Sequence, residues 1–418
     1  MDYTKMRPES LMMTYGYKPK LSEGSLKCPI FQTSTFVFNS AMEGKRFFEV
    51  AYGLSEARQG EELGLIYSRL NNPDLEILEN RLCLWDKAED CAIFESGMSA
   101  IATAMMEFMQ PGDLLLYSRP VYGGTDHFIN NFLKKLNIES VGFSLEDSRE
   151  EIIEKINQSG RADRLAMIHI ETPANPTNAL IDIEMCAEIK RTFSTADKEV
   201  ILSVDNTYMG PIWQHPLKHG ADLVLYSATK YIGGHSDVIA GACLGSKAHI
   251  ARVKGLRTFM GNMAAPFTGW MLMRSLETLK VRMEQQARNA VEVARYLRNH
   301  PKVEKVYFLG FIGETGTERE KEIYRKQYLS SGAMIAFDVK GGEKEAFAFL
   351  DNLQLIKLAV SLGGTESLAE HPYSMTHADV PQDIKNAMSI TEKLIRVSVG
   401  VEYYEDIISD MRQALDKL

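Results

Sequence analysis

The chain has 418 residues, of which 45% are hydrophobic and 25% are charged, so its composition is that of a globular protein and excludes a disordered one. Its 47 Lys and Arg and 56 Asp and Glu give a formal charge of −9, which excludes a bulk electrostatic attraction to nucleic acid or to an anionic membrane. The sequence holds no apolar run long enough for a signal peptide or a spanning helix, and its five cysteines include no CxxC pair. We therefore expect a soluble, cytoplasmic protein of about two domains, without nucleic-acid or membrane partners.

Three parts are expected along the chain. The sequence of residues 1–65 shows no regular pattern and predicts an irregular arm rather than a packed domain. At Asn72-Pro73-Asp74 a capping residue, a first-turn proline and an acidic residue predict the start of a helix. We expect a large domain over 66–265 and a smaller C-terminal domain over 266–418.

Short apolar runs alternate with helical patterns through the second part, which is typical of strands buried on both faces of a parallel sheet. The expected strands lie at 91–94, 114–117, 166–170, 200–204, 223–226 and 242–244. In the third part, a single long helical pattern runs over 268–299, and strand-like runs follow at 303–309, 333–339 and 395–399 before a closing helix at 404–418. These patterns predict an α/β domain with a mostly parallel sheet, followed by an α+β domain.

Polar residues follow three of the predicted strands. Asn175 lies in the segment Glu171-Thr172-Pro173-Ala174-Asn175-Pro176, Asp205 begins Asp205-Asn206-Thr207, and Lys230 ends Ser227-Ala228-Thr229-Lys230. In open α/β sheets, ligands bind beyond the carboxyl ends of the strands. A lysine that bonds covalently to an aldehyde, a carboxylate that keeps a pyridine nitrogen protonated, and hydroxyls for a phosphate are the groups that pyridoxal phosphate requires. Ser96-Gly97-Met98, at a strand–helix junction, offers further backbone N–H groups for phosphate.

Other kinds of site fit the sequence less well. A lysine after a strand is usually a surface residue, and only its combination with the other strand-end residues favours a cofactor site. No GxGxxG follows a predicted strand, which argues against a dinucleotide-dependent oxidoreductase. His215 and His219 are four residues apart, but Pro216 intervenes and no HExxH motif is present, so no metal site is expected. A non-catalytic protein of the same fold would be expected to lack Lys230 or Asp205.

The ordered set of motifs resembles the Cys/Met-metabolism, or trans-sulfuration, family of pyridoxal-phosphate enzymes. The most specific string is Ser227-Ala228-Thr229-Lys230-Tyr231-Ile232-Gly233-Gly234-His235, and Ser361-Leu362-Gly363-Gly364, Met375-Thr376-His377 and Arg396-Val397-Ser398-Val399-Gly400 also match. The resemblance runs from Tyr67 to residue 402. It implies an aspartate aminotransferase-like (fold type I) large domain and a smaller α+β domain.

The resemblance also implies roles around the cofactor, pyridoxal 5′-phosphate. Lys230 would hold it covalently and move protons, and Asp205 would pair with its pyridine nitrogen. Tyr122 would stack on the ring and is the candidate acid for a leaving sulfur. The remaining cofactor contacts implied are Gly97, Met98, Ser227 and Thr229 at the phosphate and Asn175 near the ring hydroxyl.

Two further groups of residues follow from the resemblance. Tyr67 and Arg69 would reach the phosphate from a neighbouring subunit, so that a dimer is the catalytic unit and a tetramer, a dimer of dimers, is expected. Arg396 would bind the α-carboxylate of the substrate, because a planar guanidinium suits a carboxylate, and Ser361 and Val360 would also face the substrate.

The expected reaction is a γ-elimination from methionine, homocysteine or cystathionine that releases a thiol, 2-oxobutanoate and ammonia. Gly124 stands where methionine γ-lyases generally have a cysteine, and the missing side chain is expected to leave space for other groups. Val360 stands where cystathionine-handling members tend to have Glu. The sequence therefore favours a carbon–sulfur γ-lyase, with O-acylhomoserine sulfhydrylase or cystathionine γ-synthase activity as alternatives.

Overall fold

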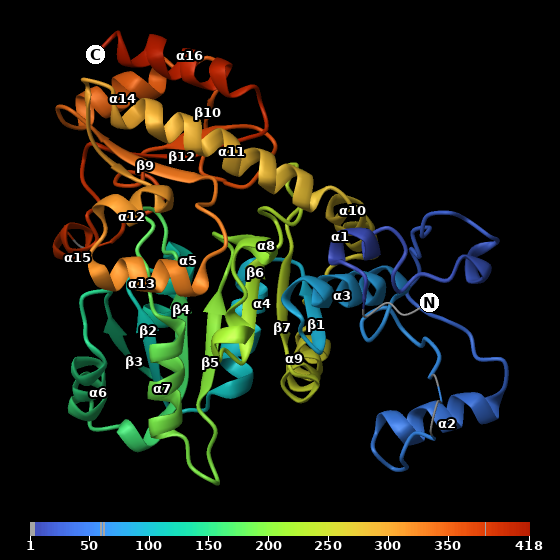
Figure 1. Ribbon diagram of the computed structural model, residues 1–418. Helices are drawn as coiled ribbons and strands as arrows, with labels where there is room; N and C mark the ends of the chain where they lie inside the picture. The colour runs from blue at the N-terminus through green and yellow to red at the C-terminus, as the bar shows by residue number, and fades with distance from the viewer. Residues whose placement is uncertain (1–4, 59–60, 62, 381) are drawn as a thin grey trace.

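The computed structural model describes residues 5–58, 61, 63–380 and 382–418, and a seven-stranded sheet forms its centre (Figure 1). The strand order is β1-β7-β6-β5-β4-β2-β3. These strands are β1 (Asp90–Phe94), β2 (Leu114–Ser118), β3 (Glu139–Phe143), β4 (Leu165–Glu171), β5 (Ile201–Asp205), β6 (Leu223–Ser227) and β7 (Gly241–Gly245). All six predicted strands are present, and β3 is a strand that the sequence pattern did not predict.

The sheet is mostly parallel, as predicted. β3, β2, β4, β5 and β6 pair in parallel, whereas β7 runs antiparallel to both β6 and β1. Buried side chains of α4 and α9 pack on one face, and those of α6 and α7 pack on the other. Apolar cover on both faces explains why the central strands read as unbroken hydrophobic runs. The helices around this sheet are α3 (Pro73–Asp86), α4 (Gly97–Phe108), α5 (Gly123–His127), α6 (Arg149–Gln158), α7 (Ile183–Phe193), α8 (Gly210–Trp213) and α9 (Lys247–Met260).

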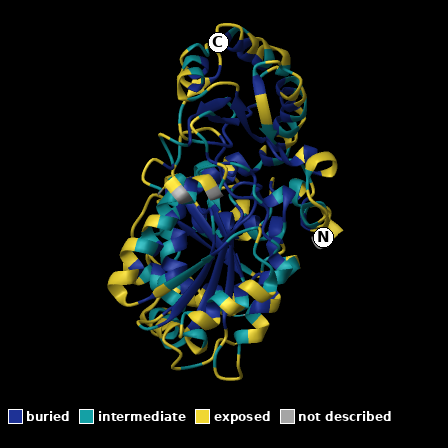
Figure 2. Ribbon diagram, turned by 90° about the vertical axis from the view of Figure 1, so that its left-hand side faces the viewer, coloured by how far each residue is buried: buried dark blue, intermediate teal, exposed yellow. Residues whose placement is uncertain are grey.

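A second, five-stranded sheet follows in the chain, with the order β10-β11-β12-β9-β8. Its strands are β8 (Val303–Tyr307), β9 (Met334–Val339), β10 (Lys357–Leu358), β11 (Leu368–Glu370) and β12 (Leu394–Ser398). The accompanying helices are α10 (Pro266–Leu276), α11 (Leu279–Arg298), α12 (Ile312–Thr315), α13 (Glu318–Gln327), α14 (Glu343–Asp351), α15 (Gln382–Ala387) and α16 (Tyr404–Leu415). The prediction of one helical stretch over 268–299 was wrong in detail, because the chain breaks at Glu277 and Thr278 into α10 and α11. Figure 2 shows that most strand residues of both sheets are buried.

The N-terminal segment was predicted to be an irregular arm, but it contains helices. It contains α1 (Pro8–Leu11) and α2 (Ala41–Ala51), and α2 stands apart from the body of the molecule (Figure 1). Ser40 caps α2 by accepting a hydrogen bond from the Glu43 N–H, which satisfies a first-turn donor. No residue of α2 is buried, and its contacts are with nearby segments, since Phe47 packs against Phe38 and Arg46 pairs with Glu61.

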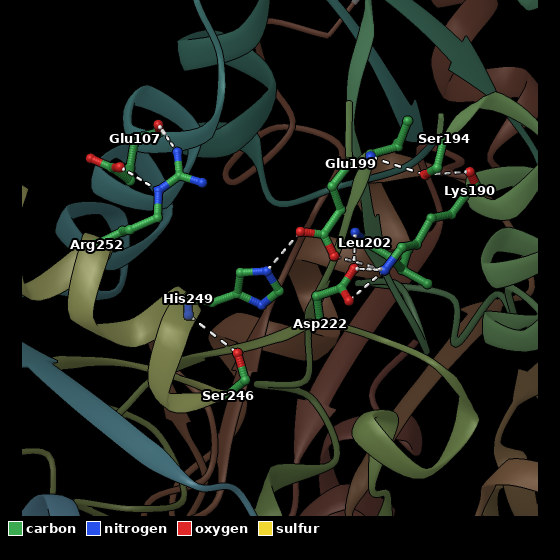
Figure 3. Close-up of polar contacts among 10 residues, drawn as sticks. Glu107, Lys190, Ser194, Glu199, Leu202, Asp222, Ser246, His249 and Arg252 are labelled. Atoms are coloured by element: carbon green, nitrogen blue, oxygen red, sulfur yellow. Dashed lines mark hydrogen bonds and ion pairs between the residues drawn. The ribbon is translucent and has the colours of Figure 1, made fainter. Parts of the chain in front are cut away.

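Polar contacts fix the edge of the large sheet that lies opposite the carboxyl ends of its strands (Figure 3). Asp222, just before β6, accepts a hydrogen bond from Leu202 N at 2.7 Å and pairs through Oδ2 with Lys190 Nζ of α7 at 2.6 Å. Through these contacts, the Asp222 carboxylate links the amino ends of β5 and β6. Their carboxyl ends, which carry Asp205 and Ser227, are therefore held in register. In the described part of the chain, no helix is both long and apolar enough to cross a membrane.

Candidate active site

A cavity of about 260 Å³ lies at the carboxyl ends of β4, β5 and β6, next to residues of the second sheet. It brings together most of the residues predicted from the sequence. Those lining it are Gly97, Met98, Tyr122, Asn175, Asp205, Ser227, Thr229, Lys230, Val360 and Arg396. The chain therefore assembles one site from residues up to 299 positions apart.

The N-terminus of α4 opens toward this cavity. Ser96 caps the helix by accepting from Ser99 N, and Gly97 is its first residue. A Cβ at Gly97 would lie 2.8 Å from the Cβ of Ser227, so only glycine lets α4 approach the end of β6 this closely. Free N–H groups of the first helical turn and a hydroxyl thereby face the same space, which is the arrangement that binds phosphate.

Two buried carboxyl groups lie at the ends of neighbouring strands. Glu171 on β4 and Asp205 on β5 are paired in register. Burial raises the pKa of both groups, and the nearby Asp205 charge raises that of Glu171 further. The structure pairs neither with a lysine or arginine in the part of the chain it describes. This end of the sheet is therefore suited to receive a positively charged group.

Glu171 also holds two neighbouring segments in place, which the sequence did not predict. Its Oε2 accepts from Tyr122 N at 2.6 Å, and its Oε1 accepts from Asn175 N at 3.0 Å. Both oxygens of one side chain thus fix the backbone of two residues that line the cavity. The position of Glu171 at a strand end was the signal in the sequence, but its partners could be found only in the fold.

Lys230 follows β6 and projects its amine into the site. Its Nζ donates to Ser361 Oγ at 3.1 Å. Burial and the positive charge of Arg396 lower the pKa of Lys230, whereas the charge of Glu370 opposes this shift. A lysine with a lowered pKa is neutral more often at physiological pH, and the neutral amine is the form that acts as a nucleophile or base.

Arg396, on β12 of the second sheet, reaches the cavity with only 3% of its side chain exposed. Its Nη1 donates to Asn175 Oδ1 at 3.0 Å, and its Nη2 donates to the Ser361 carbonyl oxygen at 2.9 Å. Nη1 also lies 2.7 Å from Oε1 of Glu370, whose side chain is fully buried. The guanidinium is therefore fixed by residues of both sheets.

The expectation of free space at Gly124 was wrong, because the aromatic ring of Tyr122 lies there. A Cβ at Gly124 would lie 2.6 Å from Cε1 of Tyr122 and 3.2 Å from Sδ of Met98. The ring itself fills the room that the missing side chain leaves. Val360, in contrast, lines the cavity with 57% exposure and presents an apolar surface to it.

Tyr67 and Arg69 do not line the cavity of their own chain. Arg69 Nη1 donates to the Thr258 carbonyl oxygen at 2.8 Å, and its guanidinium lies 5.7 Å from the centroid of the Tyr67 ring. Tyr67 is 39% exposed. A contact of either residue with a cofactor would need a second subunit.

Several residues at the site were not predicted from the sequence. Thr207 Oγ1 accepts from Ser227 N at 2.8 Å and so orders the start of the lysine loop. Tyr208 OH donates to Asn175 Oδ1 at 3.5 Å. The other lining residues that were missed as site residues are Ser96, Ile101, Glu171, Ile239, Leu362 and Thr376.

The residues present fit pyridoxal phosphate. The glycine-lined end of α4 and the nearby hydroxyls suit its phosphate, the carboxyl pair at β4 and β5 suits a protonated ring nitrogen, and Lys230 is within the same cavity. An exposed aromatic ring, that of Tyr122, lies at the mouth. The phosphate, the ring nitrogen, the aldehyde and the aromatic ring of the cofactor each have a complementary group in this cavity.

The buried carboxyl group of Glu171 leads to a prediction about stability in the cofactor-free protein. Because the pKa of Glu171 is raised in the folded state, the folded protein binds more protons than the unfolded one above the ordinary carboxylate range of about pH 4–5. The free energy of unfolding should therefore fall as the pH rises above that range. Glu171→Gln should flatten this fall, and Glu150→Gln, at an exposed position, should not. Urea unfolding at a series of pH values measures the slopes, and equal slopes in all three proteins would contradict the assignment.

Comparison with known proteins agrees with the site. The family model of the Cys/Met metabolism PLP-dependent enzymes matches residues 9–416. The chain is 40% identical to the L-methionine gamma-lyase of Porphyromonas gingivalis, over 94% of each chain, and 36% identical to the cystathionine gamma-lyase of Bacillus subtilis, over 99% of this chain and all of that one. The solved structure of cystathionine gamma synthase from Xanthomonas oryzae superposes with a TM-score of 0.86 at 30% identity and covers 99% of this chain and 98% of that one.

These matches span nearly the whole chain and confirm the resemblance, the fold class and the cofactor. The architecture is that of fold type I, and the cofactor is pyridoxal phosphate. The chain belongs to the Cys/Met metabolism family of PLP-dependent enzymes.

Proposed function

We propose that the protein is a carbon–sulfur γ-lyase that acts on methionine, homocysteine or cystathionine and releases a thiol, 2-oxobutanoate and ammonia. The observation that carries the proposal is the single cavity in which Lys230, Arg396 and Tyr122 meet. Curated relatives over most of the chain are named L-methionine gamma-lyase and cystathionine gamma-lyase, which supports elimination rather than another reaction of the family.

Residues at the ends of β4, β5 and β6, at the start of α4 and at the N-cap of α5 would hold the cofactor. Lys230 would bind it covalently, and Asp205 would pair with the pyridine nitrogen. Tyr122 would stack on the ring, and Asn175, which accepts from Arg396, would hold the ring hydroxyl. Gly97, Met98, Ser227 and Thr229 would bind the phosphate.

Substrate groups are assigned to the residues that remain. Arg396 binds the α-carboxylate, because its guanidinium is buried and already oriented by Asn175 and Ser361. Ser361 Oγ accepts from Lys230 and holds the amine next to the substrate. Val360 contacts the distal end of the substrate side chain.

The protein groups move the protons. When bound, pyridoxal phosphate supplies an electron-withdrawing ring that acidifies the Cα proton of the amino acid. Lys230 removes that proton, and the burial and the Arg396 charge that lower its pKa favour the neutral amine needed for this step. Tyr122, which lines the cavity and is partly exposed, donates a proton to the sulfur as the Cγ–S bond breaks. The elimination also removes a Cβ proton, and water then hydrolyses the product to 2-oxobutanoate and ammonia.

We extend the proposal to the assembly. Tyr67 and Arg69 complete the phosphate site of a neighbouring subunit in a homodimer, and two dimers form a tetramer in the cytoplasm. The arm over 1–65 contacts the neighbouring subunit. The large domain over 66–265 and the C-terminal domain over 266–418 follow it in the chain. Support comes from Val37, Met42 and Tyr52 of the arm, which are exposed large hydrophobic side chains of the kind that oligomer interfaces cover.

A γ-replacement activity is the second candidate, because cystathionine gamma synthase from Xanthomonas oryzae is among the solved structures that superpose on the chain. The two reactions differ in the fate of the carbon skeleton once the γ-substituent has departed. A γ-synthase or sulfhydrylase joins a thiol to that skeleton, whereas a γ-lyase releases it as 2-oxobutanoate.

A panel of substrates tests the proposal. We expect purified enzyme to form 2-oxobutanoate from methionine, homocysteine or cystathionine without an added thiol, and Lys230→Ala to form none. Chromatography of the products from these amino acids, and from O-acetylhomoserine with and without a thiol, measures both reactions. The γ-lyase proposal would be contradicted if the enzyme formed a thioether from O-acetylhomoserine and a thiol but no 2-oxobutanoate from any sulfur amino acid. That result would favour the γ-replacement activity.

Val360 generates a prediction about substrate choice. Cystathionine carries an ammonium and a carboxylate beyond its sulfur, and burying these charges against an apolar side chain is unfavourable. Wild type should therefore prefer methionine or homocysteine. Val360→Glu should shift the ratio of kcat/KM values toward cystathionine by about 1–3 kcal/mol, if the new carboxylate bonds to the distal ammonium.

Val360→Gln is the matched control, because it adds similar bulk without the charge. The measurement is kcat/KM for methionine and cystathionine in all three proteins. A strong preference of wild type for cystathionine that Val360→Glu leaves unchanged would show that position 360 is not the selector.

A further inference from the structure

Arg396 has a buried counter-ion in its own chain. Glu370 is the last residue of β11 and stands directly opposite Arg396 in the antiparallel pairing of β11 with β12. Opposed residues in such a pair hold their Cβ atoms close together, and here Glu370 Oε1 lies 2.7 Å from Arg396 Nη1. The contact joins two side chains that are 0% and 3% exposed.

The remaining donors of Arg396 are not equally engaged. Nη1 donates to Asn175 and Nη2 donates to the Ser361 carbonyl, whereas Nε is buried without a partner among the described residues. Glu370 has a similar asymmetry, since Oε1 accepts from Thr376 Oγ1 at 3.1 Å and Oε2 is buried without a partner in the same part of the chain. Both Nη atoms of the guanidinium are therefore engaged within the chain, and one polar atom of each partner, Nε of Arg396 and Oε2 of Glu370, is buried without a hydrogen bond among the described residues.

Electrostatics gives this pair two consequences. A buried guanidinium without a counter-ion is strongly destabilising, so a neighbouring carboxylate stabilises the site before substrate arrives. The same carboxylate repels a second carboxylate that binds Arg396, and at this short range in a buried site such repulsion is substantial. Glu370 should therefore keep Arg396 in place and also weaken the binding of both the amino acid and the 2-oxo acid product.

We propose that Glu370 is a positioning residue that serves as the internal counter-ion of Arg396 and sets how tightly the site binds a carboxylate. The inference rests on the proposed role of Arg396 in the γ-lyase. Glu370 does not itself line the cavity, but it contacts two residues that do, Arg396 and Thr376, and it acts through Arg396. By moderating the affinity for a carboxylate, it favours release of the 2-oxo acid.

The charged and titratable groups around Glu370 come from four segments. Arg396 faces it from β12, and Lys230 and Tyr208 interact with its charge from the loops after β6 and β5. His377 follows Thr376 in the segment after β11, and burial lowers the pKa of this imidazole to about 4, so it is neutral at physiological pH. Arg396 is therefore the cation in direct contact with Glu370, and loss of the Glu370 charge should act mainly on it.

Equilibrium binding of a matched ligand pair tests the proposal without turnover. Norleucine carries an α-carboxylate but no γ-leaving group, and pentylamine is the same molecule without the carboxylate. Titration calorimetry of the holoenzyme gives Kd for each. Glu370→Gln keeps the shape and an acceptor for Thr376 but removes the charge, so it should bind norleucine roughly tenfold more tightly and pentylamine with unchanged affinity.

Two further variants make the outcome decisive. Glu370→Asp keeps the charge and should bind norleucine more nearly like wild type. Glu304→Gln removes the acid of an exposed pair with Lys393 in the same sheet and should change neither affinity. Unchanged or weaker norleucine binding in Glu370→Gln would overturn the proposal, as would an equal change for pentylamine.

Arg396→Ala separates this proposal from the one on which it rests. If Arg396 binds the α-carboxylate, this variant should lose the preference for norleucine over pentylamine. A retained preference would refute the assigned role of Arg396, and with it the role of Glu370. A lost preference together with no effect of Glu370→Gln would refute the role of Glu370 alone.

Discussion

The parallel register of β4 with β5 is the constraint on which the site depends. It places Glu171 and Asp205 side by side at the carboxyl ends of two buried strands, where burial raises the pKa of both. Two carboxyl groups so close in a buried environment are costly unless a positive charge lies nearby. A protonated pyridine ring would supply that charge, which is the role proposed for the cofactor at Asp205.

From this pair, a chain of contacts links the two sheets. Glu171 holds the backbone of Tyr122 and Asn175, Asn175 accepts from Arg396, and Arg396 meets Glu370 within the second sheet. One continuous set of polar contacts therefore positions Tyr122, proposed to stack on the ring, and Arg396, proposed to bind the substrate carboxylate. The contacts of Asn175 with Glu171 and Arg396 and of Arg396 with Glu370 are buried, where hydrogen bonds and ion pairs are stronger than at the surface.

Much of this arrangement could be predicted from the sequence, because strands buried on both faces read as apolar runs and their carboxyl ends carry the polar residues. β3 was missed because it is an edge strand with the residues Glu139 to Phe143, of which only Phe143 is buried. The α2 helix was missed although Ser40 and Glu43 have the spacing of a helix cap. None of its residues is buried, so this signal was not joined by the core packing that marks the other helices.

The side-chain partners of the site could not be predicted from one sequence. Glu370 and Arg396 meet only because β11 pairs with β12, and β11 is a three-residue strand too short to show a periodic pattern. The space beside Gly124 was misjudged for a similar reason, since the orientation of the Tyr122 ring decides it. Contacts of this kind depend on register and rotamer, which are properties of the folded chain.

The central claim is that Lys230, at the end of β6, holds the cofactor next to Asp205. Reduction of the holoenzyme with borohydride fixes the cofactor to its lysine, and peptide mapping by mass spectrometry identifies that residue. The account predicts that the reduced cofactor is attached to Lys230. In the Lys230→Ala variant, no reduced cofactor should be attached to the peptide that contains position 230. Label on another lysine of the wild-type protein would contradict it.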